Sequence, residues 1–268
     1  MVVDRNLSTD DAREVIACAQ HHSPFLEAVR DGTRCKSGLA DHLGVSKSTV
    51  YNRFNRLACH ELVTRTGGRY RLTNRGRLLA DVVTETRATV ERLQRAGGFI
   101  DNIPTSELPP PVVFRDAEVV VGSERPGRPQ QVFDRVVRDA DRLFGFVPSV
   151  HARHLDGPRR IRLDEHTGEV ILRAETVEHL LSDHPDSLRK TCRVDGLELF
   201  ETDRELPFGL VIADEPDELL CLSAHTAHGN ESGLLLNDAA AALEWARSTY
   251  RTHRQNASRL HVGIDKPT

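Results

Sequence analysis

Basic residues gather in one stretch of the chain, where their type and spacing suit them to binding a polyanion. Between Gly44 and Arg77 eight basic residues face the single acid Glu61, a local charge of +7. Residues 1–98 carry 16 basic against 11 acidic residues (+5), and residues 99–268 carry 20 against 29 (−9), for −4 overall. A basic surface within an acidic protein favours a partner such as nucleic acid. The eight residues are Lys47, Arg53, Arg56, Arg65, Arg69, Arg71, Arg75 and Arg77.

A helix suited to a DNA groove is predicted directly after the turn at Gly44-Val45. Ser46 can cap it, because a serine hydroxyl accepts a hydrogen bond from a free amide of the first helical turn. Val50, Phe54 and Leu57 follow at i, i+4 and i+7, which gathers the apolar side chains on one face. With a short helix predicted over residues 36–43, the pattern indicates a helix-turn-helix whose second helix has one polar face.

A basic β-hairpin is predicted after this helix. Residues 62–65 and 69–72 alternate apolar and polar side chains around Thr66-Gly67-Gly68, which is typical of two strands joined by a tight turn. The arginines of the hairpin can reach phosphate groups. The sequence therefore predicts a wing beside the helix-turn-helix.

Hydroxyl and amide side chains can hydrogen-bond to base edges, whereas cations beside them contact phosphates and set register. We expect Ser48, Tyr51 and Asn52 to reach bases. A basic face that binds protein instead of DNA is the alternative. The predicted DNA-binding residues are Ser46, Lys47, Ser48, Thr49, Tyr51, Asn52, Arg53, Arg56, Arg65, Arg69 and Arg71.

A long helix is predicted over residues 77–97. Leu79, Val83, Thr86, Val90 and Leu93 are spaced 4, 3, 4 and 3 residues apart, which is the pattern of a coiled-coil seam. Leu79, Val83, Val90 and Leu93 are therefore predicted dimerisation residues, and packing on the chain's own domains is the alternative. Gly97-Gly98 and the proline-rich stretch 104–111 then predict a linker.

Alternating strands and helices are predicted in the second half, which indicates an α/β domain with a parallel or mixed sheet. Strands are expected at 118–122, 144–147, 170–172, 197–200, 209–213 and 219–222, and helices at 130–143, 174–182, near 187 and 237–256. The predicted domains are a DNA-binding domain over 1–76, a linker or dimerisation helix over 77–98 and an α/β effector-sensing domain over 108–258.

Other residue patterns could bind ligands. His151 and His154, and likewise His225 and His228, have metal-ligand spacing, but surface or packing histidines are the commoner reading and we predict neither a metal site nor a cofactor. Gly122, Ser123 and Arg125 follow a predicted strand, where α/β proteins bind anions, and are a candidate ligand site. The five cysteines form no CxxC pair, so neither a disulfide framework nor a zinc knuckle is indicated.

The stretch LADHLGVSKSTVYNRFNRL, continued by ELVTRTGGRYRLTNRGRLLA, resembles the winged helix-turn-helix of archaeal transcription regulators. The second half, with EVVVG and LPFGLVIAD, is similar to haloarchaeal and methanogen regulators whose middle domain is named after a methanogenesis regulatory protein. That resemblance implies relation to sugar-sensing archaeal regulators and a phospholipase D-like, non-catalytic fold. Glu61 stands where the family usually has glycine, and Phe54 where it usually has a smaller aliphatic residue.

The sequence predicts a cytoplasmic, homodimeric, sequence-specific regulator that binds double-stranded DNA and has an effector-sensing or oligomerisation domain. It has no apolar N-terminal signal and no run long enough to span a bilayer. The alternative is a hydrolase or metal-binding enzyme with an accessory winged helix. Phospholipase D relatives use His-x-Lys pairs, and none of the four paired histidines has a lysine two residues on, so we expect no enzymatic activity.

Overall fold

The chain folds into two compact units. This computed structural model describes residues 9–32, 35–101, 103–122, 127–150, 167–193, 195–214, 217–225 and 231–261. Unit 1 spans Met1–Ala88 and unit 2 spans Thr89–Thr268, so the division falls inside helix α5 (Asn74–Arg95) and within the predicted linker helix. None of the helices in the described ranges is both long enough and apolar enough to cross a membrane.

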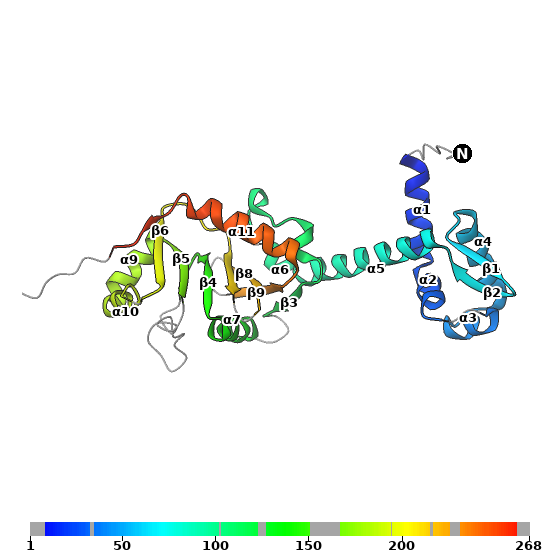
Figure 1. Ribbon diagram of the computed structural model, residues 1–268, viewed down its shortest axis with the longest axis horizontal. Coiled ribbons are helices and arrows are strands. Elements are labelled where there is room, and N and C mark those ends of the chain that lie inside the picture. Colours follow the sequence, from blue (N-terminus) through cyan, green and yellow to red (C-terminus); the bar gives the residue numbers. More distant parts are fainter. Residues whose placement is uncertain are drawn as a thin grey trace, which may run out of the picture. The chain divides into compact units, whose positions relative to one another are not determined.

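Unit 1 combines helices with a two-stranded hairpin (Figure 1). Helix α1 (Thr9–His21) and helix α2 (Ser23–Arg30) precede the helix-turn-helix of α3 (Lys36–His42) and α4 (Lys47–Cys59). Strands β1 (Val63–Thr66) and β2 (Arg69–Leu72) form the hairpin, and α5 follows. Their apolar faces meet in one core that includes Phe25, Leu26, Leu39, Val50, Leu57, Leu62, Tyr70, Ala80 and Val83. The predicted elements of this unit are all present.

Unit 2 is built on one mixed sheet with the strand order β10-β6-β5-β4-β7-β8-β9-β3. Strand β4 pairs with β5, and β5 with β6, in parallel, and the other neighbours are antiparallel. The strands are β3 (Glu118–Val121), β4 (Arg142–Val147), β5 (Thr167–Arg173), β6 (Leu197–Thr202), β7 (Gly209–Asp214), β8 (Leu219–His225), β9 (Glu231–Asn237) and β10 (Ser258–Arg259).

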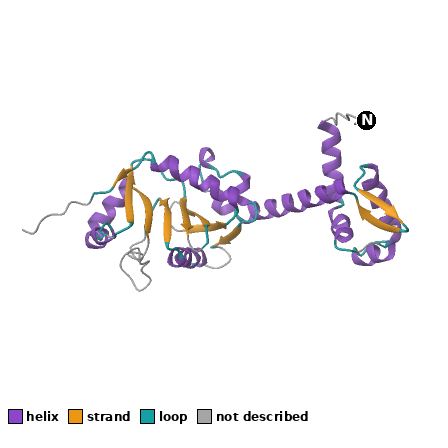
Figure 2. Ribbon diagram, viewed as in Figure 1, coloured by secondary structure: helices purple, strands orange, loops and turns teal. Residues whose placement is uncertain are grey.

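Helices cover both faces of this sheet (Figure 2). On one face, α11 (Ala240–Arg254) packs with α6 (Gly97–Ile100) and η2 (Pro111–Phe114) over strand residues such as Phe146, Ile171 and Phe200. On the other face, α7 (Arg128–Asp139) covers Leu143, Val211 and Leu234, while α9 (Ala174–Asp183) and α10 (Pro185–Thr191) cover Leu172 and Leu199. Neighbouring strand residues therefore enter different cores, as the two-residue repeat of a strand requires.

The structure differs from the sequence prediction at the ends of several helices, and two of these differences involve neighbouring strands. Helix α7 ends at Asp139 instead of residue 143, because Leu143 is a buried residue of β4. Helix α11 begins at Ala240 instead of Asn237, which is the last residue of β9. Strand β9 escaped prediction because Leu234, Leu235 and Leu236 are all buried, and a strand covered on both faces has no polar alternation.

The predicted linker lies within unit 2. Its flanking and internal residues Ala96, Phe99, Ile103, Val113 and Phe114 are all buried in the core beneath α11. The 3-10 turn η1 (Thr105–Glu107) between these residues is exposed, whereas η2 buries Val113 and Phe114, so the proline-rich stretch is anchored to the core by the residues on either side of it. Glycine and proline mark a break in helical structure, which is not the same as a domain boundary.

The predicted dimerisation residues on α5 are largely used by the chain itself. Leu79 packs against the core of unit 1 and Val83 is buried in it, while Leu93 packs against the core of unit 2. Val90 is the exposed member, with 46% of its surface accessible. At three of the four positions the seam spacing is accounted for by packing within the chain, the alternative that the sequence left open.

Candidate nucleic-acid interface

The turn between α3 and α4 depends on Gly44, which has a φ of 62°. Its left-handed conformation lets the Gly44 amide bond to the Asp41 carbonyl and the Val45 amide bond to the Ala40 carbonyl, at 3.3 and 2.9 Å. Glycine is suited to this conformation because it has no Cβ. These hydrogen bonds end α3 in a tight turn, so that α4 begins a few residues later.

Ser46 positions α4 by capping it. Its hydroxyl accepts a hydrogen bond from the Thr49 amide at 3.1 Å and lies 2.7 Å from the Ser48 hydroxyl and 2.9 Å from the Thr49 hydroxyl. The predicted cap is therefore present. Ser46 and Thr49 hold the first helical turn in shape, whereas Ser48 remains exposed beside them.

The two faces of α4 differ sharply. Val50 and Leu57 are fully buried, and the half-buried Phe54 packs on Tyr70 with ring centroids 4.8 Å apart. Ser48, Asn52 and Asn55 lie on the opposite face and are exposed. Helical spacing places these three side chains in one row. Asn55 was left out of the predicted contacts, although its spacing from Ser48 and Asn52 is enough to find it.

Lys36 belongs to the same surface. Its ammonium group lies 5.3 Å from the centre of the Tyr51 ring, and 46% of the Tyr51 surface is exposed. A cation over an aromatic face is an attractive arrangement that holds both side chains in place. Lys36 was not predicted because it precedes the basic stretch, and only its position at the start of α3 relates it to α4.

Arg53 and Arg56 lie on the side of α4 that faces α1. Burial lowers the pKa of His22, which lies between α1 and α2, and the charges of His21, Arg53 and Arg56 lower it further. His22 is 5% exposed, and its Nδ1 atom has no hydrogen-bond partner. Arg56 is exposed, whereas Arg53 is half-buried. Of these two predicted phosphate contacts, Arg56 is therefore the more accessible.

The wing divides its three arginines between two faces. Gly67 and Gly68, with φ values of 56° and 77°, form the two-residue turn that matches strand twist. Arg65 pairs in register with Tyr70, and its Cζ lies 5.6 Å from the centre of the Tyr70 ring. Arg69 and Arg71 project from the other face with Thr66 and Thr64, their register partners. The sequence could not separate these arginines without the register.

Glu61 ends α4 in a left-handed conformation, with a φ of 59°. The Leu62 amide bonds to the Leu57 carbonyl and the Glu61 amide bonds to the Ala58 carbonyl, at 3.0 and 2.9 Å, which is the Schellman pattern. A residue other than glycine therefore occupies a left-handed position that favours glycine, at the place where the family usually has glycine.

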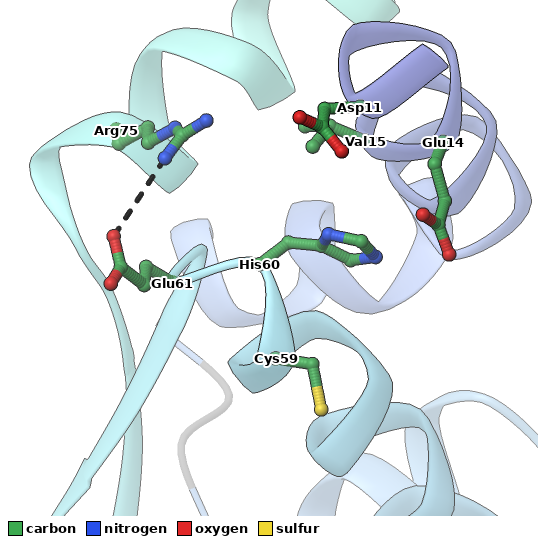
Figure 3. Close-up of a pocket in the computed structure, with 7 residues that line it drawn as sticks. All are labelled: Asp11, Glu14, Val15, Cys59, His60, Glu61 and Arg75. Atoms are coloured by element: carbon green, nitrogen blue, oxygen red, sulfur yellow. Dashed lines mark ion pairs between the residues drawn. The ribbon is translucent and has the colours of Figure 1, made fainter. Parts of the chain in front are cut away.

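The Glu61 turn borders a small cavity of about 270 Å³ between α1 and the end of α4 (Figure 3). The Arg75 guanidinium lies 3.7 Å from the Glu61 carboxylate across one side of it. The lining residues are Asp11, Glu14, Val15, Cys59, His60, Glu61 and Arg75. The cavity thus brings acidic residues of α1 next to the turn that orients the hairpin.

The other predicted ligand residues fall mostly outside the described residues. Gly122 follows β3, but Ser123 and Arg125 are not described, nor are His151, His154 and His228. Within the described ranges, no three histidine, cysteine or carboxylate side chains are grouped so that they could hold a metal ion.

Together, the helix-turn-helix, the hairpin wing and the separate mixed-sheet unit define a two-domain protein of the winged-helix class. Two family models match the two parts of the chain. Residues 10–95 match the HVO_A0261 N-terminal domain, and residues 126–256 match the middle domain of the methanogenesis regulatory protein FilR1. The chain belongs to the archaeal transcription regulators that carry these domains.

Comparisons with solved structures gave distant similarities. TrmBL2, described as an archaeal chromatin protein with a novel mode of DNA binding, is 13% identical, covers 94% of this chain and all of its own, and has a TM-score of 0.41. The phospholipase D family member Nuc from Salmonella typhimurium is 10% identical over 55% of this chain and 99% of its own, with a TM-score of 0.40. Both scores are below 0.5 and do not establish a shared fold. A comparison with curated proteins found no match.

Proposed function

We propose that unit 1 binds double-stranded DNA, with α4 in the major groove and the wing on the phosphate backbone. The observation that carries this proposal is the exposed row of Ser48, Asn52 and Asn55 on a helix whose opposite face is buried. Neutral donors and acceptors in a row suit base edges, and an asparagine amide can bond to adenine through two hydrogen bonds. Lys47, Arg56, Arg69 and Arg71 supply exposed cations beside that row.

The chain acts as a sequence-specific regulator in the cytoplasm, as a homodimer on a two-fold symmetric site. Half-sites about one helical turn apart suit a dimer that presents two such helices. Unit 2 senses a small-molecule effector, has a phospholipase D-like arrangement and does not catalyse a reaction. Its sheet of mixed strands with helices on both faces and its lack of His-x-Lys pairs among the four paired histidines support this part of the proposal.

The test is fluorescence anisotropy with the DNA upstream of the chain's own gene, measured against a scrambled duplex over a range of salt concentrations. Asn52→Ala is expected to reduce the preference for the specific duplex by about 5- to 150-fold, because one two-bond base contact contributes about 1–3 kcal/mol of discrimination. Arg69→Ala is expected to weaken binding to both duplexes alike and to lower the salt slope, the dependence of log affinity on log salt concentration, by about 1.

Arg189→Ala is the matched control, because Arg189 is an arginine of α10 in unit 2 with a 42% exposed side chain, and its removal changes the net charge equally. It should leave the preference for the specific duplex and the salt slope as they are. Equal affinity of the unchanged protein for both duplexes would refute sequence-specific binding. Loss of affinity in Arg189→Ala as large as in Arg69→Ala would show that general charge, and not the wing, governs binding.

A further inference from the structure

A polar cavity of about 430 Å³ lies where strands β4, β5 and β6 begin. These neighbouring strands are parallel, so their first residues meet at one edge of the sheet, and Arg142 is opposite Thr167 while Gly168 is opposite Leu197. The lining residues are Arg142, Phe144, Thr167, Gly168, Glu169, Cys192, Arg193, Asp195, Gly196, Leu197, Glu198 and Arg259. It is separate from the nucleic-acid interface, which lies in unit 1.

Two glycines shape part of this cavity. Gly168 and Gly196 have φ values of 129° and 93°, and the Gly168 amide donates to the Gly196 carbonyl at 2.8 Å. A Cβ at Gly168 would overlap the Leu143 carbonyl, and one at Gly196 would come within 2.9 Å of the Thr167 side chain. Because neither position can hold a larger residue without strain, this part of the wall is bare backbone.

Charges of both signs line the cavity in equal number. Arg142, Arg193 and Arg259 supply three guanidinium groups, and Glu169, Asp195 and Glu198 supply three carboxylates. Arg259 forms an ion pair with Glu198 at 2.8 Å, and Arg142 lies 3.8 Å from Asp214, outside the cavity. A lining of this kind disfavours a simple anion, which would meet the carboxylates, and equally disfavours a simple cation.

Glu169 is the most firmly fixed carboxylate of the lining. Its Oε2 atom accepts hydrogen bonds from the Tyr250 hydroxyl and from Arg254 Nε, the latter at 2.8 Å. Burial raises the pKa of Glu169, but the hydrogen bonds from Tyr250 and Arg254 outweigh burial and lower that pKa overall. Glu169 therefore keeps a negative charge, and its side chain is 30% exposed.

Arg193 is the cation best placed to meet a ligand. Its side chain is exposed, and no acceptor among the described residues forms an ion pair with it, in contrast to Arg142 and Arg259. A carboxylate is a suitable partner because a guanidinium can bond to both of its oxygens at once. The cavity thus combines a fixed carboxylate with an arginine that keeps its hydrogen-bond donors.

We propose that this cavity binds a small zwitterion of the α-amino acid class, whose ammonium group bonds to Glu169 and whose carboxylate bonds to Arg193. The inference rests on the effector-sensing role proposed for unit 2, for which it names the ligand class. Tyr250 and Arg254 belong to α11, and the Arg254 guanidinium lies 3.4 Å from the centre of the Phe200 ring. Occupation of Glu169 therefore acts directly on the contacts that hold α11 against the sheet.

The test measures ligand binding to the full chain without DNA, so that its failure is distinguishable from a failure of DNA binding. Each of the twenty common amino acids is added during thermal unfolding followed by the fluorescence of Trp245, the single tryptophan, which lies in α11. For tryptophan and tyrosine, which fluoresce themselves, unfolding is followed by calorimetry. At least one amino acid is expected to raise the midpoint temperature of unfolding. Its affinity is then measured by isothermal titration calorimetry beside its N-acetyl derivative and its α-amide.

Both derivatives are expected to bind at least about tenfold more weakly than the amino acid, because each loses one charged hydrogen-bonding group. Arg193→Gln should weaken binding of the amino acid by a similar factor. Arg189→Gln, on α10 and outside the cavity lining, is the control and should leave binding unchanged.

Any of three outcomes overturns the proposal. The first is no effect of any amino acid on the midpoint. The second is undiminished binding of the N-acetyl derivative, which would define an anion site. The third is undiminished binding of the α-amide, which would define a cation site.

Discussion

Replacing Glu61 with glycine is expected to stabilise unit 1. Glu61 holds a left-handed conformation with a φ of 59°, because the two Schellman bonds at the end of α4 require it. A side chain in this conformation costs about 1–2 kcal/mol. Glycine removes that cost without altering either backbone hydrogen bond.

Two opposing effects reduce the gain in the free energy of unfolding. Glycine increases the conformational freedom of the unfolded chain, which offsets about 0.4–1 kcal/mol. The substitution also removes the Glu61–Arg75 ion pair, whose side chains are 69% and 45% exposed and which contributes a few tenths of a kcal/mol at most. The net stabilisation is about 0.5–1 kcal/mol, or roughly 2–8 °C in the melting temperature of a domain of this size.

Far-UV circular dichroism reports the helices of both units, whereas Trp245 fluorescence reports unit 2. Glu61→Gly should raise the circular dichroism transition of unit 1 and leave the Trp245 transition in place. Glu61→Ala is the matched control, because it removes the ion pair and retains the left-handed side chain, and it should not stabilise. Equal melting temperatures for the glycine and alanine variants would refute the argument from backbone strain.

Three further predictions concern other residues. Gly76→Ala should destabilise unit 1 by about 1–3 kcal/mol in urea unfolding, because the added Cβ would overlap the Leu62 carbonyl, which accepts a hydrogen bond from the Thr73 hydroxyl at 3.2 Å. Gly97→Ala is the control, because a Cβ at Gly97 would meet open space. The free energy of unfolding of unit 1 should fall as the pH drops below 6.5, because the pKa of His22 is lowered in the folded protein and the unfolded chain therefore binds a proton at His22 more readily. The decrease should level off once the pH is below the lowered pKa. A pH series of urea unfolding should show this slope, and His22→Gln should remove it. Asn237→Leu should lower the Trp245 midpoint, because it removes hydrogen bonds to the Val113 and Arg115 carbonyls and to the Ala239 amide, whereas the exposed Asn52→Leu should not.

Local patterns were enough to predict the helix-turn-helix, the hairpin and the long helix that follows it. The apolar repeat of Val50, Phe54 and Leu57 identified the buried face of α4, and Gly67-Gly68 identified the hairpin turn. Each of these signals depends on neighbours within one helical turn or one hairpin. Where the outcome depended on distant partners, the same patterns were insufficient, as at β9, whose buried leucines need the whole sheet to explain them.

The candidate interface shows the same limit. Ser48, Asn52 and the wing arginines are exposed as the sequence predicted. The separation of Arg65 from Arg69 depends on strand register, and the approach of Lys36 to Tyr51 depends on how α3 packs on α4. The dimerisation pattern on α5 could not be distinguished from intrachain packing, because burial by either surface selects the same apolar spacing.

The division of α5 between two cores has a consequence for hydrogen exchange. Val83 is the last α5 residue in the core of unit 1, and Leu93 is the first that packs on the core of unit 2. Helices ordinarily open from their ends, where backbone groups lack partners. In α5 both ends are anchored by buried side chains, so the amides between residues 84 and 92 should exchange faster than those nearer either end.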